Sequence, residues 1–317
     1  MTFLFLLILF NFVVPILLLF WFWRTRPSSR AKFVSIVVLF GAALTVLVWS
    51  VPWDAAGVFW PRVYLVAFGA ILLARIIRGP RPVVWLPVRR REWIWTGLNI
   101  IFAAFWSWGV LGVVYARTIP AAPAPLELYS PFRHGSYYVV AGGANFSTNQ
   151  HFFSRVSRYA IDITKLNDWG FAASGLFSSD LRSYVAFGAD IVAPCSGEVI
   201  GTENALADQP PFNPDSSKQG TGGNHVVLFC QGHSVLIGHM RQGTVAVVVG
   251  DQVAAGQLLG QVGNSGNSIS PHIHIGAVRG LYAYDRSDRE APPGIEPVPL
   301  FIQGRFLVRG DTLTASD

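Results

Sequence analysis

The first third of the chain contains long apolar runs without a charged side chain. Such runs extend from Thr2 to Trp23, from Phe33 to Trp53 and from Trp93 to Ala116. Each is long enough to cross the roughly 30 Å of hydrocarbon in a bilayer as a helix. A fourth and weaker run, from about Ala55 to Ala74, contains a proline and an arginine near its start. The pattern predicts four transmembrane helices within residues 1–117.

The positions of lysine and arginine predict how these helices are oriented. One cluster follows the first run and another precedes the last run: Arg24, Arg26, Arg30 and Lys32, then Arg75, Arg78, Arg81, Arg89, Arg90 and Arg91. Basic loops stay in the cytoplasm, so both ends of a four-span chain lie outside. The first run has no basic segment before it and is too long for a signal peptide, so we expect it to be retained.

After Arg117 the pattern changes to short β-branched runs that are separated by turn residues. Examples are "SYYVVAGG" (136–143), "NHVVLFC" (224–230), "SVLIGHM" (234–240) and "VAVVVG" (245–250). This pattern is typical of a mostly antiparallel β domain. The proline-rich stretch "TIPAAPAPLE" before it favours an extended spacer. We therefore expect a transmembrane region over 1–117, a Pro/Ala-rich linker over 118–127 and an extracytoplasmic β domain over 128–317.

The net charge of +6 has two opposite parts. Residues 1–117 carry 12 basic and 2 acidic side chains, a balance of +10, and residues 118–317 carry 12 basic and 16 acidic ones, a balance of −4. The positive charge therefore flanks the membrane, and the soluble part lacks the basic face that a nucleic-acid-binding protein needs. We expect an integral membrane protein with its C-terminal domain outside the cytoplasm and no nucleic-acid partner.

The two cysteines of the chain, Cys195 and Cys230, both fall in the β domain. Outside the cytoplasm such a pair can persist as a disulfide, which is the pairing we expect. The alternative is two small buried thiols.

The seven histidines of the chain all follow residue 133, and two of them form the pattern "HIH". Alternate residues of a strand point to one face, so His272 and His274 are expected to lie side by side. Two neutral imidazoles on one face are half of a zinc site. The chain contains no HExxH motif, which excludes a helical zinc-peptidase site.

Four motifs of the β domain occur in an order that resembles the lysostaphin- or LytM-type zinc metallopeptidases. They are "RYAID" (158–162), "SVLIGHM" (234–240), "GDQVAAGQLLGQVGNSG" (250–266) and "PHIH" (271–274). The resemblance covers about Val139 to Ala277. It implies a small antiparallel β fold of the duplicated hybrid motif type, a Zn²⁺ cofactor and cleavage of peptidoglycan peptides.

The resemblance also implies roles for four residues. Asp162 and His274 match metal ligands, and His239 and His272 match the histidines that act beside the metal without ligating it. The family's first ligand is a histidine four residues before the aspartate, where this chain has Arg158. A guanidinium has no lone pair to give and stays protonated.

His151 is the nearest substitute for the missing ligand, because it lies 11 residues before Asp162. A turn between the two could bring them side by side, while the competing interpretation is a polar loop histidine. His225 is a second candidate for the ligand, and Arg158 itself could pair with Asp162.

These observations favour a membrane-anchored zinc metalloendopeptidase that cuts cell-wall peptidoglycan peptides. The resemblance implies a protein of the bacterial inner (cytoplasmic) membrane, with its C-terminal domain in the periplasm or outside the cell. The alternative is a catalytically inactive regulator of the same fold, which binds a cell-wall hydrolase or the wall itself. A biotinyl or lipoyl carrier would need a lysine in the turn of the hairpin, and this hairpin has none.

Overall fold

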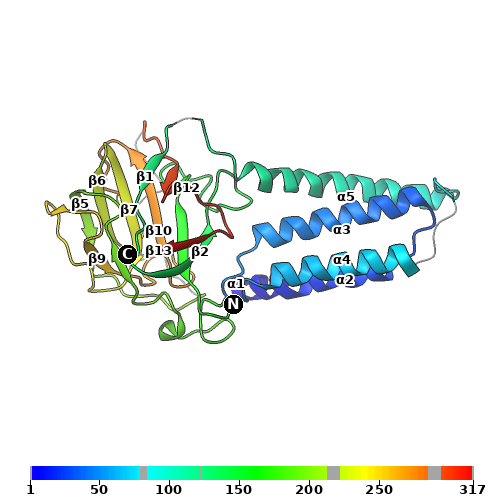
Figure 1. Cartoon of the computed structure of the whole chain (residues 1–317), viewed down its shortest axis with the longest axis horizontal. Helices are drawn as coiled ribbons and strands as arrows, with labels where there is room; N and C mark the ends of the chain where they lie inside the picture. Colours follow the sequence, from blue (N-terminus) through cyan, green and yellow to red (C-terminus); the bar gives the residue numbers. More distant parts are fainter. Residues whose placement is uncertain (1, 79–83, 122, 213–221, 285–293, 316–317) are drawn as a thin grey trace. The chain divides into compact units, whose positions relative to one another are not determined.

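The computed structural model describes residues 2–78, 84–121, 123–212, 222–284 and 294–315 (Figure 1). It divides into two compact units. One unit holds the helices, over Thr2–Trp53 and Phe59–Tyr115, and the other holds the β strands from Ala116 onward together with Asp54–Val58. That short segment belongs to the β unit because Ala172 donates a backbone hydrogen bond to Asp54, and Val58 donates one to Gly170.

The helical unit contains four runs that are long and apolar enough to cross a membrane, by length and composition, among the residues described. They are Leu4–Arg24, Arg30–Ser50, Trp60–Ile77 and Arg90–Tyr115. The first run is made of α1 (Thr2–Ile8), a π-helical turn η1 (Leu9–Val13) and α2 (Val14–Arg24). The others are α3 (Arg30–Ser50), α4 (Trp60–Arg78) and α5 (Arg90–Tyr115).

The boundary of the weakest predicted run differs from the structure. That run was predicted from Ala55, but α4 begins at Trp60, with Pro61 in its first turn. Proline is tolerated there because the first N–H groups of a helix have no partner within the helix. The residues before it form turns that belong to the β unit.

Two polar contacts join helices inside the apolar unit. Pro15 has no N–H to donate to the carbonyl of Asn11, and the Tyr64 hydroxyl of α4 donates to that oxygen instead, at 2.7 Å. At the C-terminal end of α2, the Arg75 guanidinium donates to the carbonyl oxygens of Phe22 and Thr25. A cation is favourable at that end because the last carbonyls of a helix carry partial negative charge.

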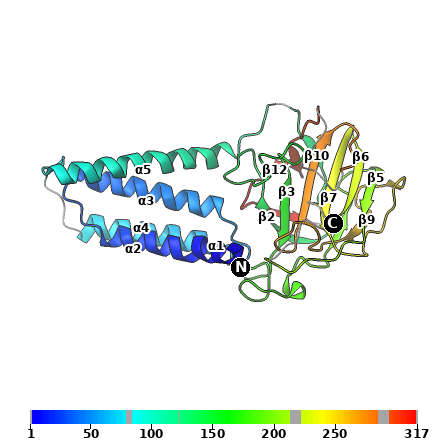
Figure 2. The same cartoon turned by 180° about the vertical axis from the view of Figure 1, so that it is seen from behind.

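The β unit is built on an eight-stranded antiparallel sheet in the order β13-β2-β3-β10-β7-β6-β5-β8 (Figure 2). Its strands are β2 (Gly135–Ala141), β3 (Ile161–Lys165), β5 (Gly197–Glu203), β6 (Asn224–Cys230), β7 (His233–Met240), β8 (Gln252–Val253), β10 (Ile273–Arg279) and β13 (Thr312–Ala315). A second sheet joins β1 (Leu126–Leu128), β11 (Leu300–Ile302) and β12 (Arg305–Phe306), and β4 (Asp190–Val192) pairs with β9 (Leu258–Gln261). A single 3-10 turn, η2, covers Leu181–Ser183. The fold class is therefore as predicted: apolar N-terminal helices and a mostly antiparallel β domain.

One predicted strand does not form. Residues 245–250 make no ladder, and Val248 and Val249 are largely exposed. The isolated backbone bonds from Ala246 to the Leu259 carbonyl and from Gly250 to the Val199 carbonyl do not make a ladder that extends a sheet. Residues 213–221, which precede β6, lie outside the described residues.

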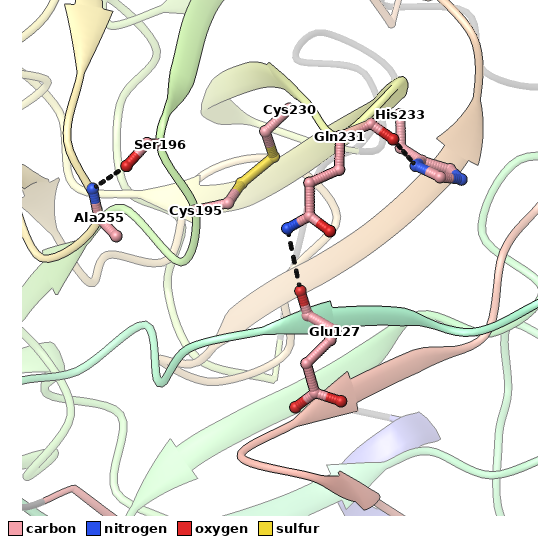
Figure 3. The surroundings of a disulfide bond; sticks show 7 residues. All are labelled: Glu127, Cys195, Ser196, Cys230, Gln231, His233 and Ala255. Atoms are coloured by element: carbon pink, nitrogen blue, oxygen red, sulfur yellow. Dashed lines mark hydrogen bonds between the residues drawn. A yellow bond between two sulfur atoms is a disulfide. The ribbon is translucent and has the colours of Figure 1, made fainter.

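Cys195 and Cys230 form a disulfide in the structure (Figure 3). It ties the end of β6 to the segment that leads into β5, across a sequence separation of 35 residues. Both cysteines are buried in the main core. Gly197 lies beside the bridge, where a Cβ would stand 2.3 Å from the Phe229 carbonyl, so this close approach requires glycine.

Candidate metal centre and active site

The register of three neighbouring strands sets the centre of the site. In β10, His274 lies opposite Asp162 of β3 on one side and opposite Gly238 of β7 on the other. Side chains alternate between the two faces of a strand, and the neighbours of these residues point into the main core: Ile161, Ile163, Ile273 and Ile275. Asp162 and His274 therefore share the opposite face.

His151 reaches this face from the turn-rich segment that joins β2 and β3. The buried side chain of Asn149 holds that segment in place, because its oxygen accepts the backbone N–H of His151 at 3.0 Å. Its amide nitrogen donates to three carbonyl oxygens, those of Gly143, Arg158 and Ala160. One buried side chain thus fixes where the turn carries the histidine.

The three side chains converge on one point. Nε2 of His151 lies 2.9 Å from Oδ2 of Asp162, and Nδ1 of His274 lies 2.9 Å from Oδ1 of the same carboxylate. The two imidazole rings meet edge to face, with centroids 4.5 Å apart. One ligand atom from each residue lies within 4.8 Å of the others. Among the residues that the structure describes, this is the group able to hold a metal ion.

Two neighbours of this cluster behave differently from one another. The side-chain amide of Gln150 donates to Oδ2 of Asp162 at 3.0 Å, beside the contact from His151. Arg158 is exposed, and its guanidinium stacks over the rings of Phe152 at 4.2 Å and Tyr159 at 5.8 Å. The Arg158 guanidinium thus makes cation–π contacts with aromatic rings. Among the described residues, the ion pairs of Asp162 are formed by histidines and not by Arg158.

His239 is turned toward the site by an irregularity in β7. The pairing of β6 with β7 shifts register between Asn224 and Val226, and His239 has a positive φ of 62°. Such bulges re-aim a side chain. Without the shift, the side chain of His239 would point to the face of β7 opposite the cluster, because Gly238 next to it pairs with His274. Its N–H donates to the Gly222 carbonyl at 2.8 Å, and a Cβ on Gly238 would stand 2.9 Å from that oxygen.

The hydrogen bonds of His239 and His272 determine which ring nitrogen of each faces the site. Nδ1 of His239 lies 2.8 Å from the carbonyl oxygen of Ser265, and Nδ1 of His272 lies 2.7 Å from that of Ser270. A carbonyl only accepts, so each Nδ1 carries the proton and each Nε2 keeps its lone pair. The rings lie 4.7 Å apart, and Nε2 of His272 is 3.8 Å from Oδ2 of Asp162.

Burial and neighbouring charges set the ionisation of the cluster. Burial alone would raise the pKa of Asp162, but the charges and hydrogen bonds of the surrounding histidines hold that pKa well below its usual range. Burial lowers the pKa of His239 well below its usual value, and it also lowers that of His274. An ionised Asp162 and a neutral His274 are the charge states in which these two side chains can bind a divalent cation.

The donor set fits zinc. Two imidazole nitrogens and a carboxylate oxygen are a ligand set of catalytic zinc sites, which leave a further position open. Arg158 and His225 do not belong to the set: Arg158 stacks on aromatic rings, and the ring of His225 contacts the Gly223 carbonyl at 2.8 Å. His151 is therefore the residue that stands beside Asp162 and His274.

Three features of the site have no clear signal in the sequence. The Asn149 bonds and the Gln150 contact join a side chain to residues 2 to 12 positions away, and such bonds produce no periodic pattern in the sequence. The bulge at His239 also has no specific sequence signal, although the glycines before β6 and Gly238 itself are typical of close backbone approach.

A comparison with known proteins identifies the family of this region. Residues 181–285 match the model of Peptidase family M23. His239, His272 and His274 lie inside the matched region, and His151 and Asp162 precede it. No curated protein matches the chain.

Several solved structures are similar to the β unit. The catalytic domain of the antimicrobial peptidase lysostaphin from Staphylococcus simulans is 23% identical over 41% of this chain and 71% of its own, with a TM-score of 0.26. A zinc-containing peptidase from Vibrio cholerae is 20% identical over 34% of this chain and 29% of its own, with a TM-score of 0.24. A variant of the catalytic domain of the prophage-encoded M23 protein EnpA from Enterococcus faecalis is 28% identical over 34% of this chain and 75% of its own, with a TM-score of 0.19. Residues 181–285 thus carry a domain that matches Peptidase family M23, which supports the resemblance of the motifs to the lysostaphin- and LytM-type peptidases.

Proposed function

We propose that this protein is a membrane-anchored zinc metalloendopeptidase that cuts peptides of cell-wall peptidoglycan. The observation that carries the proposal is the convergence of His151, Asp162 and His274 beside His239 and His272, whose rings lie 4.7 Å apart and whose Nδ1 atoms are bound by backbone carbonyls. A domain that only binds a partner has no physical need for this arrangement. The M23 match supports a peptidase of this class.

His151, Asp162 and His274 would hold the zinc ion through one atom each. Bound zinc would polarise the peptide carbonyl and lower the pKa of a water molecule toward about 7. Arg158 plays no part in this ligand set, because its charge is engaged by aromatic rings away from the carboxylate.

His239 and His272 would move one proton during cleavage. Each presents an unprotonated Nε2, so either can accept a proton as the water oxygen attacks the carbonyl carbon. The protonated ring then becomes a donor, first toward the oxyanion and finally toward the leaving amine when the C–N bond breaks. The carbonyls of Ser265 and Ser270 keep both rings in the orientation that this transfer needs.

Zinc content tests the proposal directly. Full-length protein purified in detergent should contain about one zinc ion per chain by elemental analysis. His151→Ala and His274→Ala should each lose it, and the matched change Arg158→Ala should keep it. Purified sacculi should release new amino groups only with the zinc-loaded protein, and chelation should stop the release.

The same experiment distinguishes the peptidase from the alternative function, a catalytically inactive regulator. Zinc-free native protein that releases nothing from sacculi would contradict the peptidase and favour a regulator that binds cell-wall hydrolases. In that case His151→Ala would change neither metal content nor activity.

A further inference from the structure

A groove of about 430 Å³ opens beside the candidate metal centre. His151, His239 and His274 border it on the side of the cluster. Most of the remaining wall comes from the turn segment that follows His151, through Phe153, Ser154, Arg155 and Ser157. Gly222, Leu236 and Asn267 complete it. The segment that supplies the substitute ligand therefore also shapes the space where a substrate would lie.

Two anchors hold this wall in place. Val156 is buried with Val227, Leu236 and Val278 in a small apolar cluster. The Ser154 hydroxyl accepts the backbone N–H groups of Val156 and Ser157 at 3.3 and 3.0 Å. The backbone on either side of Arg155 is thus fixed, while the Arg155 side chain itself is exposed.

The charge of the groove is opposite to that of the domain around it. Residues 118–317 carry a balance of −4, from 12 basic and 16 acidic side chains. Among the described residues that line the groove there is no carboxylate, and Arg155 carries the permanent charge. No described residue forms an ion pair or hydrogen bond with its guanidinium. An arginine placed in this way is suited to bind a carboxylate through two parallel hydrogen bonds.

We propose that Arg155 binds a free carboxylate of the peptide substrate, so that the enzyme selects peptides with an acidic group near the bond that is cut. The inference rests on the proposed function, because it names the chemistry of the peptide that the same site would take. Stem peptides of peptidoglycan carry such free carboxylates. The exposed, stacked rings of Phe146 and Phe153 offer an apolar surface beside the cation for the remainder of the peptide.

The test compares two preparations of sacculi with full-length protein in detergent. One keeps its free carboxylates, and in the other carbodiimide and ammonia have converted them to amides. The native protein should cut the first preparation about 10- to 100-fold faster, the range expected from a charge-assisted bidentate contact. Arg155→Gln should slow cutting of the first preparation to the rate seen with the second, leave the second unchanged and keep the zinc content.

Arg133→Gln is the matched control, because Arg133 is exposed on the same unit and lines a different hollow, together with Tyr129. It should alter neither rate. Equal rates of the native protein on both preparations, or an equal loss on both with Arg155→Gln, would overturn the assignment. If the native protein cuts neither preparation, the proposed peptidase activity is wrong. Co-sedimentation of the protein with the two preparations then tests whether Arg155 binds free carboxylates. Tighter binding to the preparation with free carboxylates, lost in Arg155→Gln, supports the role of Arg155. Equal binding of the native protein to both preparations overturns it.

Discussion

At the scale of single residues, the Asp162 carboxylate is the best-connected group of the site. Its Oδ1 faces His274, and its Oδ2 receives both His151 and Gln150. A carboxylate that ligates a metal ion keeps lone pairs that need partners, and such partners orient the ligand. Gln150 is suited to this role because its amide can donate but cannot take a negative charge.

Replacing Gln150 should therefore weaken metal binding without removing a ligand. We expect Gln150→Leu to lower zinc affinity about 10- to 100-fold, measured by competition with a chelator of known affinity. Gln252→Leu is the control, since Gln252 is exposed and its amide reaches Glu198 at 3.5 Å. An unchanged affinity in Gln150→Leu would show that the contact with Asp162 does not support the ligand.

Replacing His239 or His272 should greatly reduce turnover but keep the zinc, whereas replacing a proposed ligand should remove the zinc. Because neither belongs to the three-residue cluster, His239→Ala and His272→Ala should keep about one zinc per chain. Each should lose roughly 100- to 10,000-fold in turnover, the range for removal of a proton-transfer group. The measurement pairs elemental analysis with the rate of amino-group release from sacculi. Loss of zinc from both variants, with zinc retained in His274→Ala, would mean that the roles are reversed.

At the scale of elements, regular alternation was predictable and local irregularity was not. Asp162 and His274 each lie between core isoleucines, so period-2 patterning places both on one face. The approach of His151 depends on Asn149, whose side-chain bonds replace a ladder over the segment from β2 to β3. The run 245–250 shows the reverse error, because β-branched composition alone does not make a strand when the neighbouring chain offers no ladder.

The disulfide is the covalent link between two of these elements, and its removal should be measurable. We expect Cys230→Ser to destabilise the β unit by about 2–4 kcal/mol, and Cys195→Ser to do the same. Urea-dependent proteolysis reports the opened population of that unit. Thiol labelling of the native protein, unfolded without reductant, should modify neither cysteine. Full labelling of both would show that no bridge is present in the protein as made.

At the scale of the whole molecule, two independent features indicate the same compartment for the β unit. The basic side chains cluster in the segments after the first span and before the last, which predicts that those segments are cytoplasmic. The disulfide is of a kind that persists outside the cytoplasm. We therefore predict that the four apolar helices cross the membrane and that the C-terminal unit lies outside the cytoplasm.

Reporter fusions test this orientation. Alkaline phosphatase, which is active only outside the cytoplasm, should be active when fused after Asp317 and inactive when fused within the basic segment between α2 and α3. A fluorescent protein that matures only in the cytoplasm should give the reverse pattern at the same two positions. The basic segment is the internal control, because an odd number of spans would make both sites report the same compartment. A C-terminal unit in the cytoplasm would separate the site from peptidoglycan, and the substrate of the His151, Asp162 and His274 site would then be a different peptide.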